Sequence, residues 1–353
     1  MVCPDDGPAV FWKVVNAEGQ TKNADYGYNL HIDLRKEVVE SLPGAQFVGY
    51  VMDSTATNRK AMQMLQDDDP AICVIPCASH ALSLVIKHAA KYFSWINDVY
   101  SACCAFSEKL INAEKLRSEL HGIQLSEYSK KKGICAHVPT RFGSRHMVLR
   151  DVESKDAIKK LSATDIWKQT MLKGSAELKK AHDMMFALED DLFSLADKLK
   201  ELLGPVVDAI HTLEADQPTL SYLGGLYDNL EEHFKVFSDA NPHLATGEKP
   251  IDKRRKDAEV EPITLLLQFD QDRKFMWRPV MSAAAVLDPL NWCKNAVGKY
   301  HVPVQKYGDT IREELSTVVK AFDSNSDTCS GEAELIALAL HIFERKYTDS
   351  LDQ

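Results

Sequence analysis

Apolar and polar positions are patterned in two different ways along this chain, and the first pattern occupies residues 8–77. Short runs rich in β-branched and aromatic side chains predict strands, and apolar side chains spaced three and four residues apart predict helices. The predicted elements are a strand over 8–16, a helix over 24–40, a strand over 47–53, a helix over 58–66 and a strand over 72–77. This alternation is typical of an α/β layer, so we expect three strands in one sheet.

From residue 79 onward the pattern becomes helical. Helices are predicted over 79–93, 95–120, 141–161 and 220–237, with polar loops over 126–139 and 239–261. The clearest apolar stripe consists of Leu178, Met185, Leu188, Leu192, Leu195, Leu199, Leu202 and Val206. We interpret it as the core-facing side of a bundle helix rather than an intermolecular coiled coil. Gly204 and Pro205 are expected to kink or break that helix.

Composition narrows the class of protein. Of 353 residues, 45% are hydrophobic and 27% are charged, as in soluble globular proteins, and no apolar stretch approaches the length of a membrane span. The net charge of -10 disfavours indiscriminate binding to phosphate backbones, although it leaves room for a local basic groove. Eight irregularly spaced cysteines suit reduced thiols, so we expect an intracellular protein.

Asp53 is the most informative polar residue, because it closes an apolar run and opens a polar turn. A buried strand that ends in a carboxylate delivers that acid to the carboxyl edge of a sheet, where α/β sheets place ligands. The alternative interpretation is an ordinary turn or helix N-cap aspartate.

Cys77 and His80 close the next predicted strand with the spacing of half a zinc site. Cys73, Cys135 and His137 are the residues that could complete four ligands. We favour a packed, hydrogen-bonded pair at the junction of strand and helix, structural or near the site, and expect no zinc.

The order of these features resembles the hAT superfamily of DNA transposases. The features are a strand ending in Asp53, a strand followed by Cys77-Ala78-Ser79-His80, and far downstream Thr140-Arg141-Phe142. The resemblance implies an α/β plus α fold, in which a partial ribonuclease H-like layer of three strands precedes a large, mainly helical insertion. It implies two domains, a partial ribonuclease H-like domain over 1–90 and a helical insertion domain over 91–353. The second range also includes the first residues after the insertion, where the chain returns to the catalytic domain.

Metal-dependent cutting and joining of DNA is the chemistry of the resembled family. Two aspartates and a glutamate hold two Mg²⁺ or Mn²⁺ ions there, and Asp53 matches the second aspartate, as a catalytic and metal-binding residue. We find no counterpart of the first aspartate or of the glutamate, so we expect a chain truncated at both ends and not catalytic by itself.

Arg141 and Phe142 match the family's segment close to the DNA ends, where an arginine can contact phosphate and an aromatic ring can stack on a base. The alternative is a helix-start arginine and a core phenylalanine. His146 and Arg150 follow one helical turn apart and are expected to add positive charge to the same face.

The sequence therefore predicts a transposable-element-derived, hAT transposase-like protein that is catalytically incomplete. The alternatives are a domesticated module that binds DNA or another protein, and a helical protein with an unrelated role. The expected partners are DNA and, because an incomplete sheet exposes a strand edge, another copy of the chain. The resemblance implies a nuclear or otherwise intracellular protein without a membrane anchor.

Overall fold

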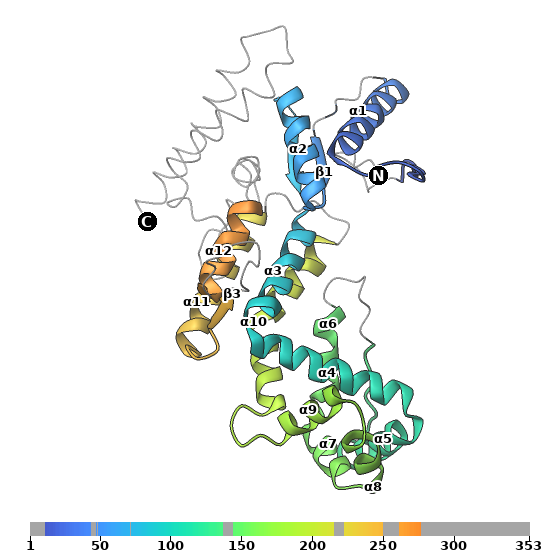
Figure 1. Cartoon of the computed structure of the whole chain (residues 1–353), viewed down its shortest axis with the longest axis vertical. Coiled ribbons are helices and arrows are strands. Elements are labelled where there is room, and N and C mark those ends of the chain that lie inside the picture. Colours follow the sequence, from blue (N-terminus) through green and yellow to red (C-terminus); the bar gives the residue numbers. More distant parts are fainter. Residues whose placement is uncertain are drawn as a thin grey trace, which may run out of the picture. The chain divides into compact units, whose positions relative to one another are not determined.

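The computed structural model describes residues 11–43, 47, 49–70, 72–136, 144–214, 222–249 and 261–276. These residues are mainly helical, with two small sheets (Figure 1). The predicted mainly helical character is therefore confirmed, whereas the described residues at the start of the chain form a sheet of two strands instead of the predicted three.

The first sheet and its two helices come from residues 24–76. The elements are α1 (Ala24–Ser41), β1 (Gly49–Met52), α2 (Ala56–Asp68) and β2 (Cys73–Pro76). β1 and β2 are parallel, with Gly49 opposite Cys73 and Met52 opposite Pro76. Buried side chains of both strands and α2 form one apolar cluster, with side chains of α1 packed against it, and its buried members are Tyr50, Met52, Ala61, Met62, Leu65, Ile72 and Val74.

The strand predicted over 8–16 is wrong within the described residues, since residues 11–17 form neither helix nor strand. The segment instead binds α1 through side chains. Trp12 Nε1 donates to Glu37 Oε1 at 3.0 Å, and Lys13 forms an ion pair with the same carboxylate. Aromatic and β-branched side chains favour a strand only when a neighbouring strand supplies backbone partners, and β1 pairs with β2 alone among the described residues.

Helices form most of the remaining described chain. They are α3 (Ala78–Tyr92), α4 (Ser94–Asn112), α5 (Glu114–Tyr128), α6 (Ser144–Met147), the 3₁₀ turn η1 (Val148–Val152), α7 (Lys155–Ser162), α8 (Asp165–Trp167), the π-helical turn η2 (Lys168–Leu172), α9 (Ala176–Met185), α10 (Leu192–Leu213), α11 (Leu223–Ala240) and α12 (Leu265–Met276). The helix predicted over 95–120 is divided at Ala113, whose backbone leaves the helical region.

The predicted apolar stripe is confirmed as a core-facing surface, but on two helices. Its members on α9 and α10 are buried, whereas Leu188 lies between these helices and is fully exposed, at 103%. Of the predicted kink or break at Pro205, the break is wrong, because α10 continues through this residue, and the kink stays a prediction. Buried neighbours on both sides, such as Leu202 and Val206, provide packing that offsets the backbone hydrogen bond that proline removes.

A hairpin occupies part of the loop predicted over 239–261. β3 (Thr246–Lys249) pairs antiparallel with β4 (Glu261–Thr264). The local sequence did not predict this hairpin, because contacts with distant residues hold it in place. Trp95 Nε1 donates to the Leu244 carbonyl at 2.9 Å, and the Gly247 backbone lies against Tyr92 and Phe93.

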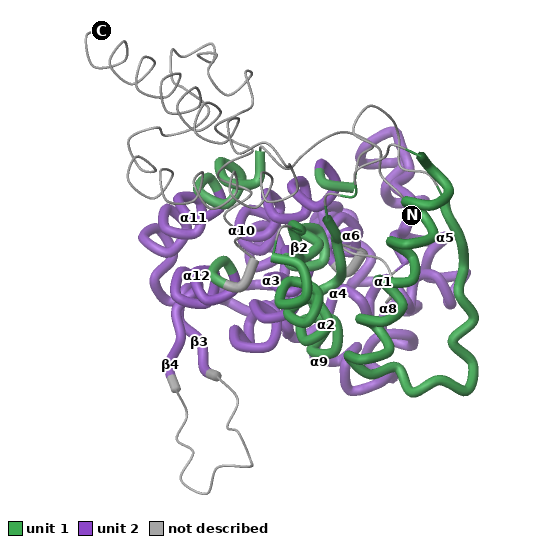
Figure 2. Tube along the Cα trace, turned by 90° about the horizontal axis from the view of Figure 1, so that it is seen from above, with its two compact units in different colours: residues 1–81, 213–229, 273–353 green, residues 82–212, 230–272 purple. Residues whose placement is uncertain are grey.

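Two compact units divide the chain (Figure 2). One comprises residues 1–81, 213–229 and 273–353, and the other residues 82–212 and 230–272. The boundaries between them fall inside α3, at the end of α10, inside α11 and inside α12. The predicted domains, 1–90 and 91–353, stay a prediction.

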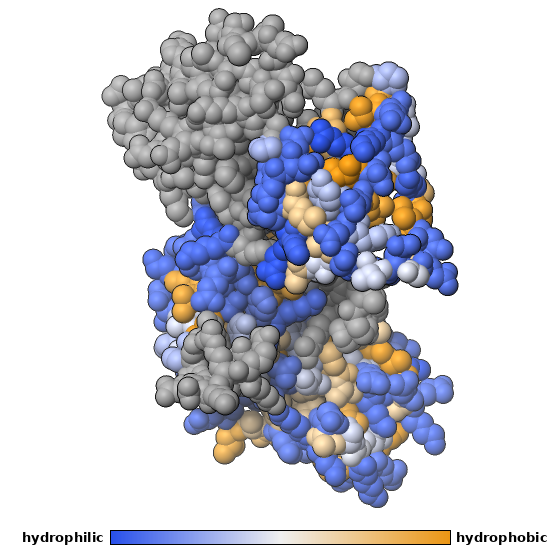
Figure 3. All heavy atoms as spheres, turned by 45° about the horizontal axis from the view of Figure 1, so that its top comes forward, coloured by the Kyte–Doolittle hydropathy of each residue, from blue (hydrophilic) through white to orange (hydrophobic). Residues whose placement is uncertain are grey.

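The described surface carries mostly hydrophilic residues on the face that Figure 3 shows, with hydrophobic residues in small separate groups. Among the described helices, none has the length and apolar character needed to cross a membrane.

Candidate functional site

Asp53 and Cys77 directly follow the two parallel strands. The Cys77 N–H donates to the Met52 carbonyl at 2.7 Å, which extends the pairing of β1 and β2 by one step. Both residues therefore lie at the carboxyl edge of the small sheet, where the sequence predicted them.

Asp53 shapes the turn from β1 into α2. Its Oδ1 accepts the Thr55 N–H at 3.3 Å and the Asn58 side-chain Nδ2 at 2.5 Å. Thr55, not Asp53, caps α2, because its hydroxyl accepts the Asn58 N–H at 3.3 Å. This geometry is that of an Asx turn, so the turn interpretation of Asp53 is realised, while its side chain remains exposed to solvent.

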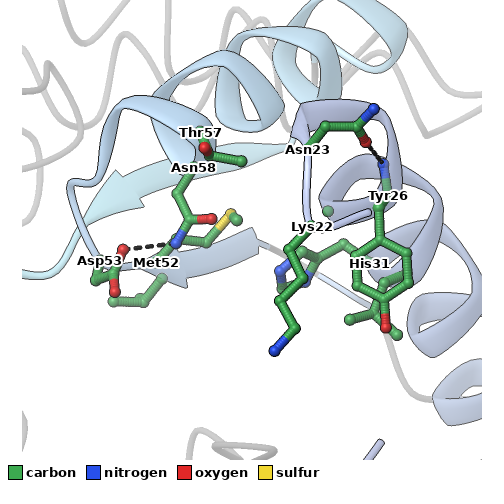
Figure 4. Close-up of a pocket in the computed structure, with 11 residues that line it drawn as sticks. Lys22, Asn23, Tyr26, His31, Met52, Asp53, Thr57 and Asn58 are labelled. Atoms are coloured by element: carbon green, nitrogen blue, oxygen red, sulfur yellow. Dashed lines mark hydrogen bonds between the residues drawn. The ribbon is translucent and has the colours of Figure 1, made fainter. Parts of the chain in front are cut away.

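An open pocket with a volume of about 320 Å³ lies between the start of α1 and the turn that follows β1 (Figure 4). Asp53, Met52, Thr57 and Asn58 lie on one side, and Lys22, Asn23, Tyr26 and His31 lie on the other. Its remaining lining residues are Gly27, Leu30 and Val51. Burial lowers the pKa of His31, which keeps its ring neutral near pH 7.

The residues around Asp53 do not fit a site for two divalent ions. Two ions that share ligands need several carboxylates converging on one point, and Asp53 is the only acidic residue among the described residues that line this pocket. One oxygen of that carboxylate already accepts two hydrogen bonds, and Lys22 brings a positive charge to the same pocket.

Cys77 and His80 lie at the junction of β2 and the first turn of α3, and both side chains are half-buried. Cys77 lies near Tyr227 of α11, whose pKa is raised by burial first and by the neighbouring Cys77 second, while Arg273 opposes the shift. No cluster of three or more His, Cys, Asp or Glu side chains able to hold a metal occurs among the described residues.

Arg141 and Phe142 lie outside the described residues. The neighbouring prediction, that His146 adds positive charge, is wrong. Its Nδ1 pairs with the Tyr100 hydroxyl at 3.1 Å, and burial lowers the pKa of His146 to about 4, with Asp208 opposing and Lys200 assisting the shift. His146 is therefore neutral near pH 7, and Arg150 alone of the two is charged.

The half-buried His146 makes stability depend on pH. Its pKa is lowered in the folded chain, so the unfolded chain binds the proton more tightly. We expect the free energy of unfolding to fall by about 1 to 3 kcal/mol as pH falls from about 7 to about 4. Urea titrations of wild type and His146→Asn test this, because the variant should lose that part of the pH dependence.

The control for this titration is His211→Asn, which removes an exposed histidine of α10. It should keep the wild-type pH dependence. An identical pH dependence in wild type and His146→Asn would contradict the assignment.

Lys22, Tyr26 and His31 are pocket residues that sequence reasoning missed. Their only sequence signal was membership of a predicted amphipathic helix or its approach, where polar side chains normally face solvent. Neither the protein-family models nor the curated proteins compared with this chain gave a match.

Proposed function

We propose that this chain is a hAT transposase-like protein that associates with DNA and does not cut DNA strands by itself. The observation that carries the proposal is the parallel pair β1–β2, which brings Asp53 and Cys77 to one sheet edge in the order found in that family. The predicted ribonuclease H-like layer belongs to the proposal, and the two-stranded parallel sheet of β1 and β2 is the observation that supports it.

The electrostatics of the Asp53 pocket support the non-cutting part of the proposal. Strand transfer in the resembled family needs two metal ions, whereas this pocket combines one carboxylate with one lysine. An ammonium group in such a site competes with a cation for the carboxylate. The role left to the chain in this proposal is binding rather than chemistry.

DNA association is tested by measuring binding at several salt concentrations. Arg141→Ala should weaken binding to duplex DNA uniformly across sequences and reduce the salt slope by about 1. The matched control is Lys115→Ala, which removes an exposed cation of α5 and should leave binding unchanged. Absence of DNA binding at low salt, or equal effects of both variants, would contradict the DNA part of the proposal.

A further inference from the structure

We propose that the pocket between α1 and the β1–α2 turn binds a nucleoside monophosphate, with the phosphate at Lys22 and a base amino group at Asp53. This inference rests on the charges and the lining of the pocket, and it is independent of the transposase-like proposal. Its volume of about 320 Å³ lies at the lower end of the range of small-molecule sites.

Opposite charges on the two sides of the pocket select a ligand with two kinds of polar group. Lys22 is exposed and forms no ion pair within the described part of the chain, so its ammonium group is available to an anion. Asp53 uses Oδ1 for the turn, and its Oδ2 accepts no hydrogen bond from any described residue. Oδ2 can therefore accept a hydrogen bond from an amino group of a ligand, as carboxylates do when they recognise the N4 amino group of cytosine.

Between these charges the lining suits a flat ring. Val51 and Met52 of β1 and Leu30 of α1 are apolar, and the Tyr26 ring projects from α1, across the pocket from Met52 (Figure 4). An aromatic ring and an apolar floor favour stacking of a base. Asn23, Thr57 and Asn58 add groups that can donate or accept hydrogen bonds at the rim. A simple amino acid would satisfy the charges but would leave the apolar part of the pocket empty.

The turn already holds Asp53 in position before a ligand arrives. Hydrogen bonds from Thr55 and Asn58 fix the carboxylate, which reduces the entropy lost on binding. The Asn23 side chain likewise accepts the Tyr26 N–H at 2.9 Å and fixes the first turn of α1. Local hydrogen bonds therefore fix polar groups on both sides of the pocket.

The test is calorimetric titration with dCMP and with deoxycytidine, which lacks the phosphate. We expect dCMP to bind with a dissociation constant on the order of 0.1 to 1 mM, since the pocket is open. Lys22→Ala should weaken dCMP binding about fivefold and leave deoxycytidine binding unchanged. Asp53→Asn should weaken the binding of both compounds about fivefold, because the amide presents a donor where the amino group needs an acceptor.

Matched controls are Lys36→Ala on α1 and Asp67→Asn on α2, which change the same charges at exposed positions outside the pocket. They should leave both affinities unchanged. A second measurement uses only the wild type: dCMP should shift the NMR signals of the His31 ring and not those of His88. No dCMP binding, equal effects of pocket and control variants, or saturation without a His31 shift would overturn the proposal.

Discussion

Trp167→Ala is expected to lower the free energy of unfolding by about 3 to 5 kcal/mol, the cost typical of truncating a fully buried tryptophan. Trp167 is 0% exposed at the end of α8. Its ring lies 6.1 Å from that of Phe106 between centroids, and its Nε1 donates to His182 Nδ1 at 3.2 Å. The substitution therefore leaves both a cavity and a histidine nitrogen without this donor.

Urea unfolding measures this loss of stability. Two further variants test whether the loss comes from the buried ring of Trp167. Trp167→Phe keeps most of the ring and should lose less stability than Trp167→Ala. Trp12→Ala removes a tryptophan that is only half-buried beside α1, and we expect a loss of about 1 kcal/mol or less. Equal losses for Trp167→Ala and Trp12→Ala would contradict the assigned core.

Gly247→Ala is expected to destabilise the chain by about 1 to 3 kcal/mol, because the added methyl group has no space. A Cβ at residue 247 would collide with the Tyr92 carbonyl oxygen and would lie 2.8 Å from the Phe93 ring. The carbonyl belongs to the end of α3 and cannot rotate away like a flexible side chain. The hairpin of β3 and β4 would have to move away from α3.

Gly122→Ala is the matched control for this substitution, with an effect of opposite sign. Gly122 lies within α5, and a Cβ there meets nothing within 4 Å. Alanine favours the helix over glycine, so we expect stabilisation by about 0.5 to 1 kcal/mol. Thermal or urea unfolding measures the stability of both variants. If Gly247→Ala were as stable as wild type, the close packing around Gly247 would be contradicted.

The pattern of apolar and polar residues predicted much of the described structure, because these elements are determined by residues close to one another in the sequence. The helix predicted over 24–40 is α1, and the apolar runs that end before Asp53 and Cys77 are β1 and β2. In each case polar residues or a proline mark the end of the apolar pattern. Segments whose structure depends on distant partners were predicted less well. Residues 11–17 do not pair with a strand, and their side chains contact Glu37 of α1. β3 packs against Tyr92 and Phe93.

The candidate site was predictable in part for the same reason. Asp53 could be selected from the sequence because it follows an apolar run. Its hydrogen bonds to Thr55 and Asn58 could not be predicted, because they depend on the geometry of the turn. Lys22 and His31 reach the pocket only because α1 lies against the β1–α2 unit. His146 carried no sequence signal of its neutral state, since burial beside Tyr100 causes it.

The most direct measurement is a nicking assay on labelled DNA with Mg²⁺ or Mn²⁺, which compares wild type, Asp53→Asn and the surface control Asp67→Asn. The amide oxygen that Asp53→Asn introduces can still accept the hydrogen bonds of the turn, so the variant should fold. We predict the same absence of metal-dependent nicking in all three proteins. Nicking by wild type and Asp67→Asn that disappears in Asp53→Asn would contradict the account and establish Asp53 as a catalytic metal ligand.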